Sequence, residues 1–254
     1  MRRAAGPLLA LVFLAGCARE VFDHTPGVAD AAIDAGSAEV DCRSAEPGTR
    51  CDDGNVCTPS STCREGECRA GTSSRECLVA GTSDRAADTQ GDSGWYYGFW
   101  SADLDDDGFY DPDSDFEPMD YCDDGNWRRP GMCEVSRDDP EYRWTSVLSH
   151  SLQHPETNPD LELPIRRWVS TVSGPARLVV SHHVGGDFGD GTTAILLLDG
   201  DELWRNDAVA GDTTGTDASF DVELEVGSLV EQLVHPIVSS ADDTTYFDLR
   251  VEGR

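Results

Sequence analysis

The sequence has no lysine. All 19 of its basic residues are arginine, and 49 acidic residues outnumber them, so the formal net charge is −30. A protein that binds nucleic acid needs a basic face that releases counterions from phosphate, and this composition argues against one. The same charge disfavours direct binding to an anionic membrane surface. We therefore expect no nucleic acid partner.

Long apolar runs are also missing beyond the N-terminus. No stretch of about 18 apolar residues occurs there, so no membrane-spanning helix is predicted in that part of the chain. Hydrophobic residues make up 38% of the sequence, which is low for a globular chain but too high, with six Trp, for a wholly disordered one. We expect one sizeable domain and additional, poorly packed segments.

The N-terminus has the layout of an export signal. Arg2 and Arg3 precede a short apolar run at 7–16, which is too short to span a bilayer as a helix. The run ends in Leu-Ala-Gly-Cys at Leu14–Cys17, which resembles the lipobox of bacterial lipoproteins. The resemblance implies that residues 1–16 are a signal peptide. The alternative is a plain secreted protein in which the cysteine is incidental.

The lipobox resemblance also implies a location. The thiol of Cys17 would carry two acyl chains, and several chains together anchor a protein stably to a membrane that it does not span. Ala18 stands where an Asp tends to retain such lipoproteins at the inner membrane, so we expect a lipid anchor in the outer membrane of the cell envelope. Residues 17–41 are rich in Ala, Asp and Gly and predict a flexible linker, and 80–92 predict a second one.

The cysteine count indicates disulfides. Nine Cys are present, and subtracting the lipidated one leaves eight, which can pair fully in an oxidising compartment. The cluster of six has no two-residue spacing and no His, so disulfides are favoured over a metal ion, while their connectivity stays open. The eight are Cys42, Cys51, Cys57, Cys63, Cys68, Cys77, Cys122 and Cys133.

Residues 42–79 predict a small disulfide-rich module. Val56 is the one candidate core residue between the first and sixth cysteines, so cross-links must hold the segment together. The run Cys51–Thr58, followed by Cys63 and Cys68, resembles the Cys-rich repeats of extracellular proteins in myxobacteria and slime moulds. That resemblance implies a rigid extracellular spacer or adhesion element without catalysis.

Residues 93–254 contain all six Trp and predict an all-β domain, an antiparallel β-sandwich of jelly-roll type. Apolar and acidic residues alternate strictly over Phe220–Val226, and Asp199-Gly200 is a hairpin signal. Ile195–Leu198 is apolar on both faces and is expected inside a sheet. The strand-like segments are 168–171, 176–182, 193–198, 202–204, 220–226, 229–234 and 245–251.

Several short motifs of this domain resemble a β-sandwich module of secreted bacterial proteins. They are Trp95–Gly98, the His154-Pro155 pair, Pro164–Ser170, Gly189–Gly191 with Asp199–Trp204, and Asp243–Phe247. The resemblance implies a fold akin to carbohydrate-binding modules, with no particular ligand assured.

One acidic loop has the spacing of a calcium site. Carboxylates at positions 1, 3, 5 and 9 with Gly at position 6 can turn inward around a hard cation, as in EF-hand and thrombospondin type 3 loops. These predicted ligands of a structural Ca²⁺ are Asp103, Asp105, Asp107 and Asp111. Ser114 replaces the Glu of an EF-hand, and the alternative is a solvated acidic loop.

No catalytic constellation emerges. Gly91–Gly94 matches the start of the nucleophile motif of trypsin-like proteases, but Trp95 follows and no suitable His segment precedes it. His182 and His183 are adjacent in a predicted strand, so their side chains point to opposite faces and cannot chelate one metal. Among 49 acids, none is singled out as a pair for glycoside hydrolysis.

We therefore expect a cell-surface lipoprotein that is not an enzyme. Its leading function is an extracellular binding module for carbohydrate, stabilised by calcium. The second hypothesis is a structural or assembly component of the cell envelope that docks to another protein, and a hydrolase is the third.

Overall fold

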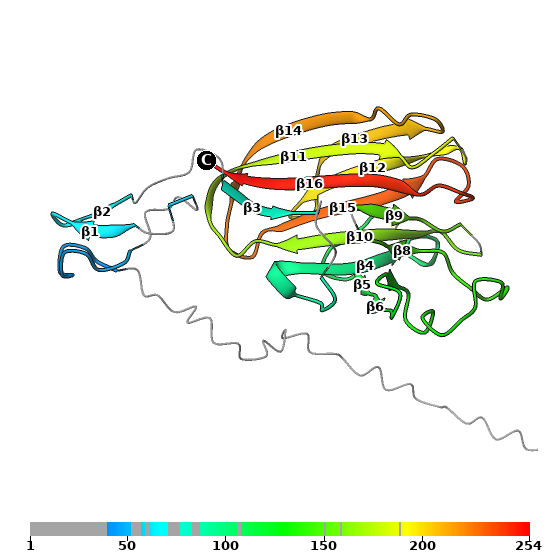
Figure 1. Cartoon of the computed structure of the whole chain (residues 1–254), viewed down its shortest axis with the longest axis horizontal. Helices are drawn as coiled ribbons and strands as arrows, with labels where there is room; N and C mark the ends of the chain where they lie inside the picture. The colour runs from blue at the N-terminus through cyan, green and yellow to red at the C-terminus, as the bar shows by residue number, and fades with distance from the viewer. Residues whose placement is uncertain are drawn as a thin grey trace, which may run out of the picture. The chain divides into compact units, whose positions relative to one another are not determined.

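The computed structural model (Figure 1) describes residues 40–51, 57–58, 61–70, 77–82, 87–105, 108–149, 151–157, 159–187 and 189–254. All of them belong to the unit Glu39–Arg254. The predicted signal peptide, Cys17 and nearly all of the first predicted linker lie outside the described residues, so lipidation stays a prediction.

The described strands of the large domain form two antiparallel sheets, and the core residues come from both (Figure 1). Consecutive strands alternate between the sheets or return within one, as in a jelly-roll-type sandwich, and this confirms the predicted all-β fold class. The six-stranded sheet has the order β13 (Asp201–Val209), β12 (Gly191–Leu198), β15 (Leu229–Pro236), β10 (Glu162–Val169), β4 (Trp95–Ser101) and β5 (Glu117–Pro118).

The second sheet of the described chain has eight strands. Its order is β14 (Thr216–Leu224), β11 (Gly174–Val184), β16 (Thr245–Gly253), β9 (Leu152–His154), β8 (Ser146–Val147), β7 (Trp127–Arg128) and β6 (Asp120–Tyr121), with β3 (Cys77–Gly81) also paired to β16. The short helices η1 (Asp92–Gly94) and η2 (Ala102–Leu104) flank β4. Among the described residues, no helix is long and apolar enough to cross a membrane.

Alternation of side chains explains most of the strands. Four of the seven predicted segments fall within β11, β12, β15 and β16. The segment 220–226 overlaps β14, which begins at Thr216 and ends at Leu224, and β13 extends its predicted segment in both directions. Asp199 and Gly200 have φ of 51° and 85° and form the tight turn between β12 and β13, as predicted. β12 lies between two strands and is buried on both faces over Ile195–Leu197.

The segment 168–171 was predicted with the wrong bounds, because β10 begins six residues earlier, at Glu162. Pro164, Arg166 and Arg167 interrupt the alternation of apolar and polar residues that would have predicted this part of the strand. Arg166 and Trp168 point into the sandwich and are buried, whereas Arg167 points out and pairs with the buried Glu231 at 2.7 Å.

The eight predicted disulfide cysteines form four disulfides, which join Cys42 to Cys63, Cys51 to Cys68, Cys57 to Cys77 and Cys122 to Cys133. In the cluster of six, the first cysteine therefore pairs with the fourth, the second with the fifth and the third with the sixth. β1 (Thr62–Arg64) and β2 (Glu67–Arg69) form a hairpin within this part. The last cysteine of the cluster starts β3, which pairs with β16 across the predicted boundary at 79 and 80.

His182 lies in the core between the sheets, and His183 points to the opposite side, as predicted from their adjacency. Nδ1 of His182 accepts a hydrogen bond from Asn206 Nδ2, and its Nε2–H donates to Thr192 Oγ1, both at 3.0 Å. Both ring nitrogens are thus satisfied by the neutral imidazole. Burial lowers the pKa of His182 to about 4.

This lowered pKa predicts a loss of stability in acid. The unfolded chain protonates His182 near its ordinary pKa of about 6.5, whereas the folded chain resists protonation until about pH 4, so stability falls as the pH drops through this window. Urea unfolding from pH 7 to pH 4 should show that the wild type loses about 3 kcal/mol more than His182→Gln. Parallel pH profiles for the two proteins would contradict this assignment.

Candidate functional site

A pocket with a volume of about 710 Å³ lies among the described residues. Its lining includes residues of the loops β9–β10, β11–β12 and β15–β16. These loops lie at the end of the sandwich away from the C-terminus (Figure 1). A pocket of this size is within the range of small-molecule sites, which is about 300–1,000 Å³. Its lining includes Trp144, His154, Glu156, Ser240, Asp242 and Tyr246.

Trp144 is the most exposed of the Trp side chains, at 43%, whereas Trp95, Trp127 and Trp168 are buried. Its indole packs edge-on against Tyr142, with ring centres 4.9 Å apart. The guanidinium of Arg137 lies 5.7 Å from the centre of the indole. The ring is therefore held in place by its neighbours while it still presents apolar surface to the pocket.

Two more aromatic side chains line this pocket. Tyr246 on β16 stacks on His183, with ring centres 4.7 Å apart and planes 14° from parallel. His154 at the end of β9 donates Nδ1–H to the Pro155 carbonyl at 2.6 Å. Burial lowers the pKa of His154, so at neutral pH its imidazole is uncharged and Nε2 is a hydrogen-bond acceptor.

A buried carboxylate joins two walls of the pocket. Glu156 is only 3% exposed. Its Oε2 accepts the backbone N–H of Trp144 at 3.0 Å. Its Oε1 accepts the N–H of Thr157 at 2.8 Å and the hydroxyl of Ser240 at 3.0 Å. Glu156 therefore fixes the position of the exposed Trp relative to the β15–β16 loop.

The β15–β16 loop is fastened from its other side by two Asp residues. Both oxygens of Asp190 accept backbone N–H groups of this loop at 3.0 Å, one from Val238 and one from Ser239. Asp243 is 1% exposed, and its Oδ1 accepts the N–H groups of Asp190 and Gly191 at 3.1 and 3.0 Å. Burial raises the pKa of Asp243 above its ordinary value, and the hydrogen bonds from these two donors offset only part of that rise.

Asp242 is the exposed carboxylate of the pocket. Its φ of 62° lies in the left-handed region, which Asp tolerates better than most residues. Backbone strain of this kind is held by surrounding structure and clusters at functional sites. The site thus combines a fixed, exposed indole, a neutral imidazole and an exposed carboxylate.

The structure does not gather the predicted calcium ligands that it describes. Oδ2 of Asp103 accepts the N–H of Leu161 at 2.8 Å, and Oδ1 of Asp111 accepts the N–H of Asp113 at 3.0 Å. In the described ranges, the one trio of candidate ligand atoms within 4.8 Å is Cys42, Cys51 and Cys68, which are all in disulfides. Asp107 lies outside the described residues, and Asp105 lines a small pocket with Asp115 and Glu117.

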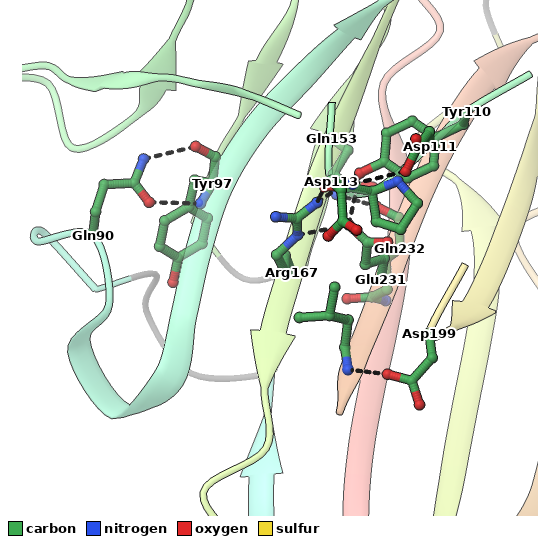
Figure 2. A network of polar contacts seen from close by, with 12 residues as sticks. Gln90, Tyr97, Tyr110, Asp111, Asp113, Gln153, Arg167, Asp199, Glu231 and Gln232 are labelled. Carbon is green, nitrogen blue, oxygen red and sulfur yellow. Dashed lines mark hydrogen bonds and ion pairs between the residues drawn. The ribbon is translucent and has the colours of Figure 1, made fainter. Parts of the chain in front are cut away.

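The segment that follows the acidic loop is clamped to the outer face of the six-stranded sheet (Figure 2). Oε1 of Glu231 accepts hydrogen bonds from Arg167 Nε and from the Tyr110 hydroxyl, each at 2.7 Å. Arg167 also donates to the Pro112 carbonyl at 2.6 Å, and its guanidinium lies 3.9 Å from the centre of the Phe116 ring. Burial, followed by the charge of Glu231, raises the pKa of the Tyr110 phenol. The sheet thus anchors residues 110–116.

Comparisons with known proteins show limited likeness. No family model matches the chain, and no curated protein matches it. Among solved structures it is similar to a family 35 carbohydrate binding module from an environmental isolate, with 12% identity and a TM-score of 0.25, over 35% of this chain and 64% of that one.

A second similar structure is CBM51 from Clostridium perfringens GH95 in complex with methyl-galactose, at 12% identity and a TM-score of 0.27, over 43% of this chain and 73% of that one. A third is the β-glucosidase from Kluyveromyces marxianus in complex with glucose, at 13% identity and a TM-score of 0.30, over 68% of this chain and 17% of that one.

Gly189 approaches Asp243 closely, so a substitution there tests whether the hydrogen bonds of Asp243 to Asp190 and Gly191 hold the β15–β16 loop in place. A Cβ at Gly189 would lie 2.1 Å from Asp243 Oδ1, whereas one at Gly131, which has nearly the same φ of +82°, would meet nothing within 4 Å. Both substitutions to Ala incur the left-handed backbone penalty. In urea unfolding, Gly189→Ala should cost about 1–3 kcal/mol more than Gly131→Ala. Equal losses would show that the contact does not hold the loop.

Proposed function

We propose that the protein is a non-enzymatic extracellular binding module that holds carbohydrate in the pocket at the loop end of the sandwich. The exposed indole of Trp144 in the wall of that pocket carries the proposal. A pyranose ring has an apolar face of C–H groups, and an aromatic ring with a negative π-face suits such a surface. Trp144 is 43% exposed in the wall of the pocket, and so large an apolar side chain is ordinarily buried unless it contacts a ligand.

The polar groups of the pocket match sugar hydroxyls. Hydroxyl groups donate to carboxylates and to the free nitrogen of a neutral imidazole, and Asp242 and His154 offer these acceptors on the pocket lining. Because Glu156, Asp190 and Asp243 fasten the loops, little conformational entropy is lost when a ligand binds.

The same contacts support binding without catalysis. Glycoside hydrolysis requires two carboxyl groups, one of which transfers a proton to the leaving group. Both oxygens of Glu156 already accept hydrogen bonds that the loop structure needs. We assign it a positioning role.

We propose further that the module is displayed from the cell envelope on a lipid attached to Cys17, with the outer membrane as its location. The leader and lipobox of the sequence support this. The four disulfides support an oxidising, extracytoplasmic compartment.

Substitution of Trp144 tests the carbohydrate site. In a glycan array followed by calorimetry with the best glycan, Trp144→Ala should weaken binding about 30-fold, because a stacked aromatic anchor contributes about 2 kcal/mol. Phe109→Ala is the matched control, since Phe109 is a 79% exposed aromatic outside this pocket. A negative array for the wild type, or equal effects of the two substitutions, would refute the proposal.

A structural Ca²⁺ on Asp103, Asp105, Asp107 and Asp111 is a separate proposal that rests on their spacing. At saturating calcium the melting temperature should rise, by about 4 °C or more if 100-fold excess over Kd adds about 2.7 kcal/mol. Asp105→Asn should abolish the rise, and Asp138→Asn, at an exposed acid outside the loop, should preserve it. No heat of binding at millimolar calcium would rule the site out.

A further inference from the structure

A second pocket, of about 300 Å³, lies between the two sheets beside β3 and β4. Its deep residues are buried and include Ala80, Trp95 and Tyr97. Its outer residues are Leu78, which is 58% exposed, and the exposed Ser93. The pocket therefore opens at η1 and β3 and closes toward the core, on a part of the molecule that the proposed carbohydrate site does not use.

Arg166 forms part of the floor of this pocket and is 2% exposed. One of its terminal nitrogens donates to the carbonyls of Leu148 and Leu152. Among the described residues, Arg166 has no ion pair within 4.0 Å, the charge of Asp248 acts on it from farther away, and its Nε has no hydrogen-bond partner. Burial lowers the pKa of Arg166 to about 10, so the group is still a cation at neutral pH.

A buried cation without a direct ion pair is costly, because two carbonyl dipoles and a more distant carboxylate replace only part of its hydration. Its neighbour on β10, Arg167, has the ion pair with Glu231 that such a charge ordinarily needs. A ligand that brought one carboxylate into the pocket would supply the missing partner of Arg166 and could also accept from its free N–H.

The remaining walls restrict the class of ligand. Val79, Ala80 and Trp95 offer an apolar lining between the mouth and the cation. Asp92, also at the mouth, disfavours ligands with several negative charges. The volume, at the lower end for small-molecule sites, suits a short molecule.

The Gly91–Gly94 turn, whose sequence matches the start of a protease nucleophile motif, lies at the mouth of this pocket. It does not contribute to the proposed carbohydrate site. Ser93 has a φ of 52° inside this turn, and its hydroxyl bonds Asp92 Oδ1 at 3.3 Å. A left-handed serine is a strained conformation of the kind found at ligand clamps. Gly94 must be glycine, because a Cβ there would lie 2.6 Å from the Val169 carbonyl.

We propose that this pocket binds a monocarboxylate with a short apolar tail, whose carboxylate pairs with Arg166 and whose tail lies against β3 and Trp95. The site is independent of the carbohydrate pocket, so either can fail alone.

Titration with butyrate tests the site. The full mature chain should bind sodium butyrate in calorimetry at fixed ionic strength, and its melting temperature should rise. Acetate should bind more weakly, since it lacks most of the tail, and n-butylammonium chloride and phosphate should not bind. A response to phosphate equal to that to butyrate would mean a general salt effect and overturn the proposal, as would the absence of any heat with butyrate.

Charge at the mouth gives a variant that leaves the core intact. Leu78→Asp adds a negative charge beside the entrance and should weaken butyrate binding about tenfold. Val209→Asp is the control, because Val209 is 60% exposed on β13 and lies outside the pocket. Equal affinities of the two variants would contradict the site.

A direct readout comes from Arg166 itself. Its buried Nε–H should give a resolved NMR signal that shifts on addition of butyrate, and Arg166→Met should remove both that signal and butyrate binding. If Arg166→Met does not fold, the Leu78→Asp comparison and the wild-type Nε–H signal still decide the matter. An Nε–H signal that butyrate leaves unmoved would overturn the proposed pairing.

Discussion

Carboxylates that accept backbone N–H groups hold the loop end of the sandwich in place, and two of them, Glu156 and Asp243, are buried. Glu156, Asp190 and Asp243 lie on three different loops, and each bonds a neighbouring loop or strand end. Removing such a carboxylate from water is unfavourable unless its oxygens are hydrogen-bonded, so these loops have few alternative arrangements. The pocket that contains Trp144 therefore has its shape before a ligand arrives.

The strongly acidic composition has several distinct structural roles. Three acids fasten the pocket loops, and Glu231 holds the segment after the acidic loop against the outer face of a sheet. Asp199 forms the β12–β13 turn and accepts the N–H of Leu229. Many of the remaining acidic side chains point from the strands into solvent and make no core contacts. The formal charge of −30 thus combines acids that hold loops and turns in place with acids that are exposed to solvent.

Sequence patterns predicted the strands well where one face is wet and one is dry, as in β14. They failed on β10, because a buried Arg and a Pro interrupt the apolar pattern of that strand. They also missed the pocket, since its residues come from loops far apart in the chain and Trp144 lies outside any patterned segment. The calcium site stays a prediction from the spacing, because Asp107 lies outside the described residues while Asp103 and Asp111 accept the backbone N–H groups of Leu161 and Asp113. Cysteine spacing predicted disulfides, but only the folded chain shows their order.

The indole N–H signals of the Trp side chains, observed by NMR during titration with the best glycan, show whether carbohydrate binds at Trp144. The chain has six Trp, and only one of them lines the loop-end pocket. The Trp144 signal should shift and saturate with the affinity measured by calorimetry, while the signals of Trp95, Trp127 and Trp168 stay in place. A saturating glycan that leaves Trp144 unmoved, or that moves Trp100 on the outer face of the sheet instead, would contradict binding at Trp144.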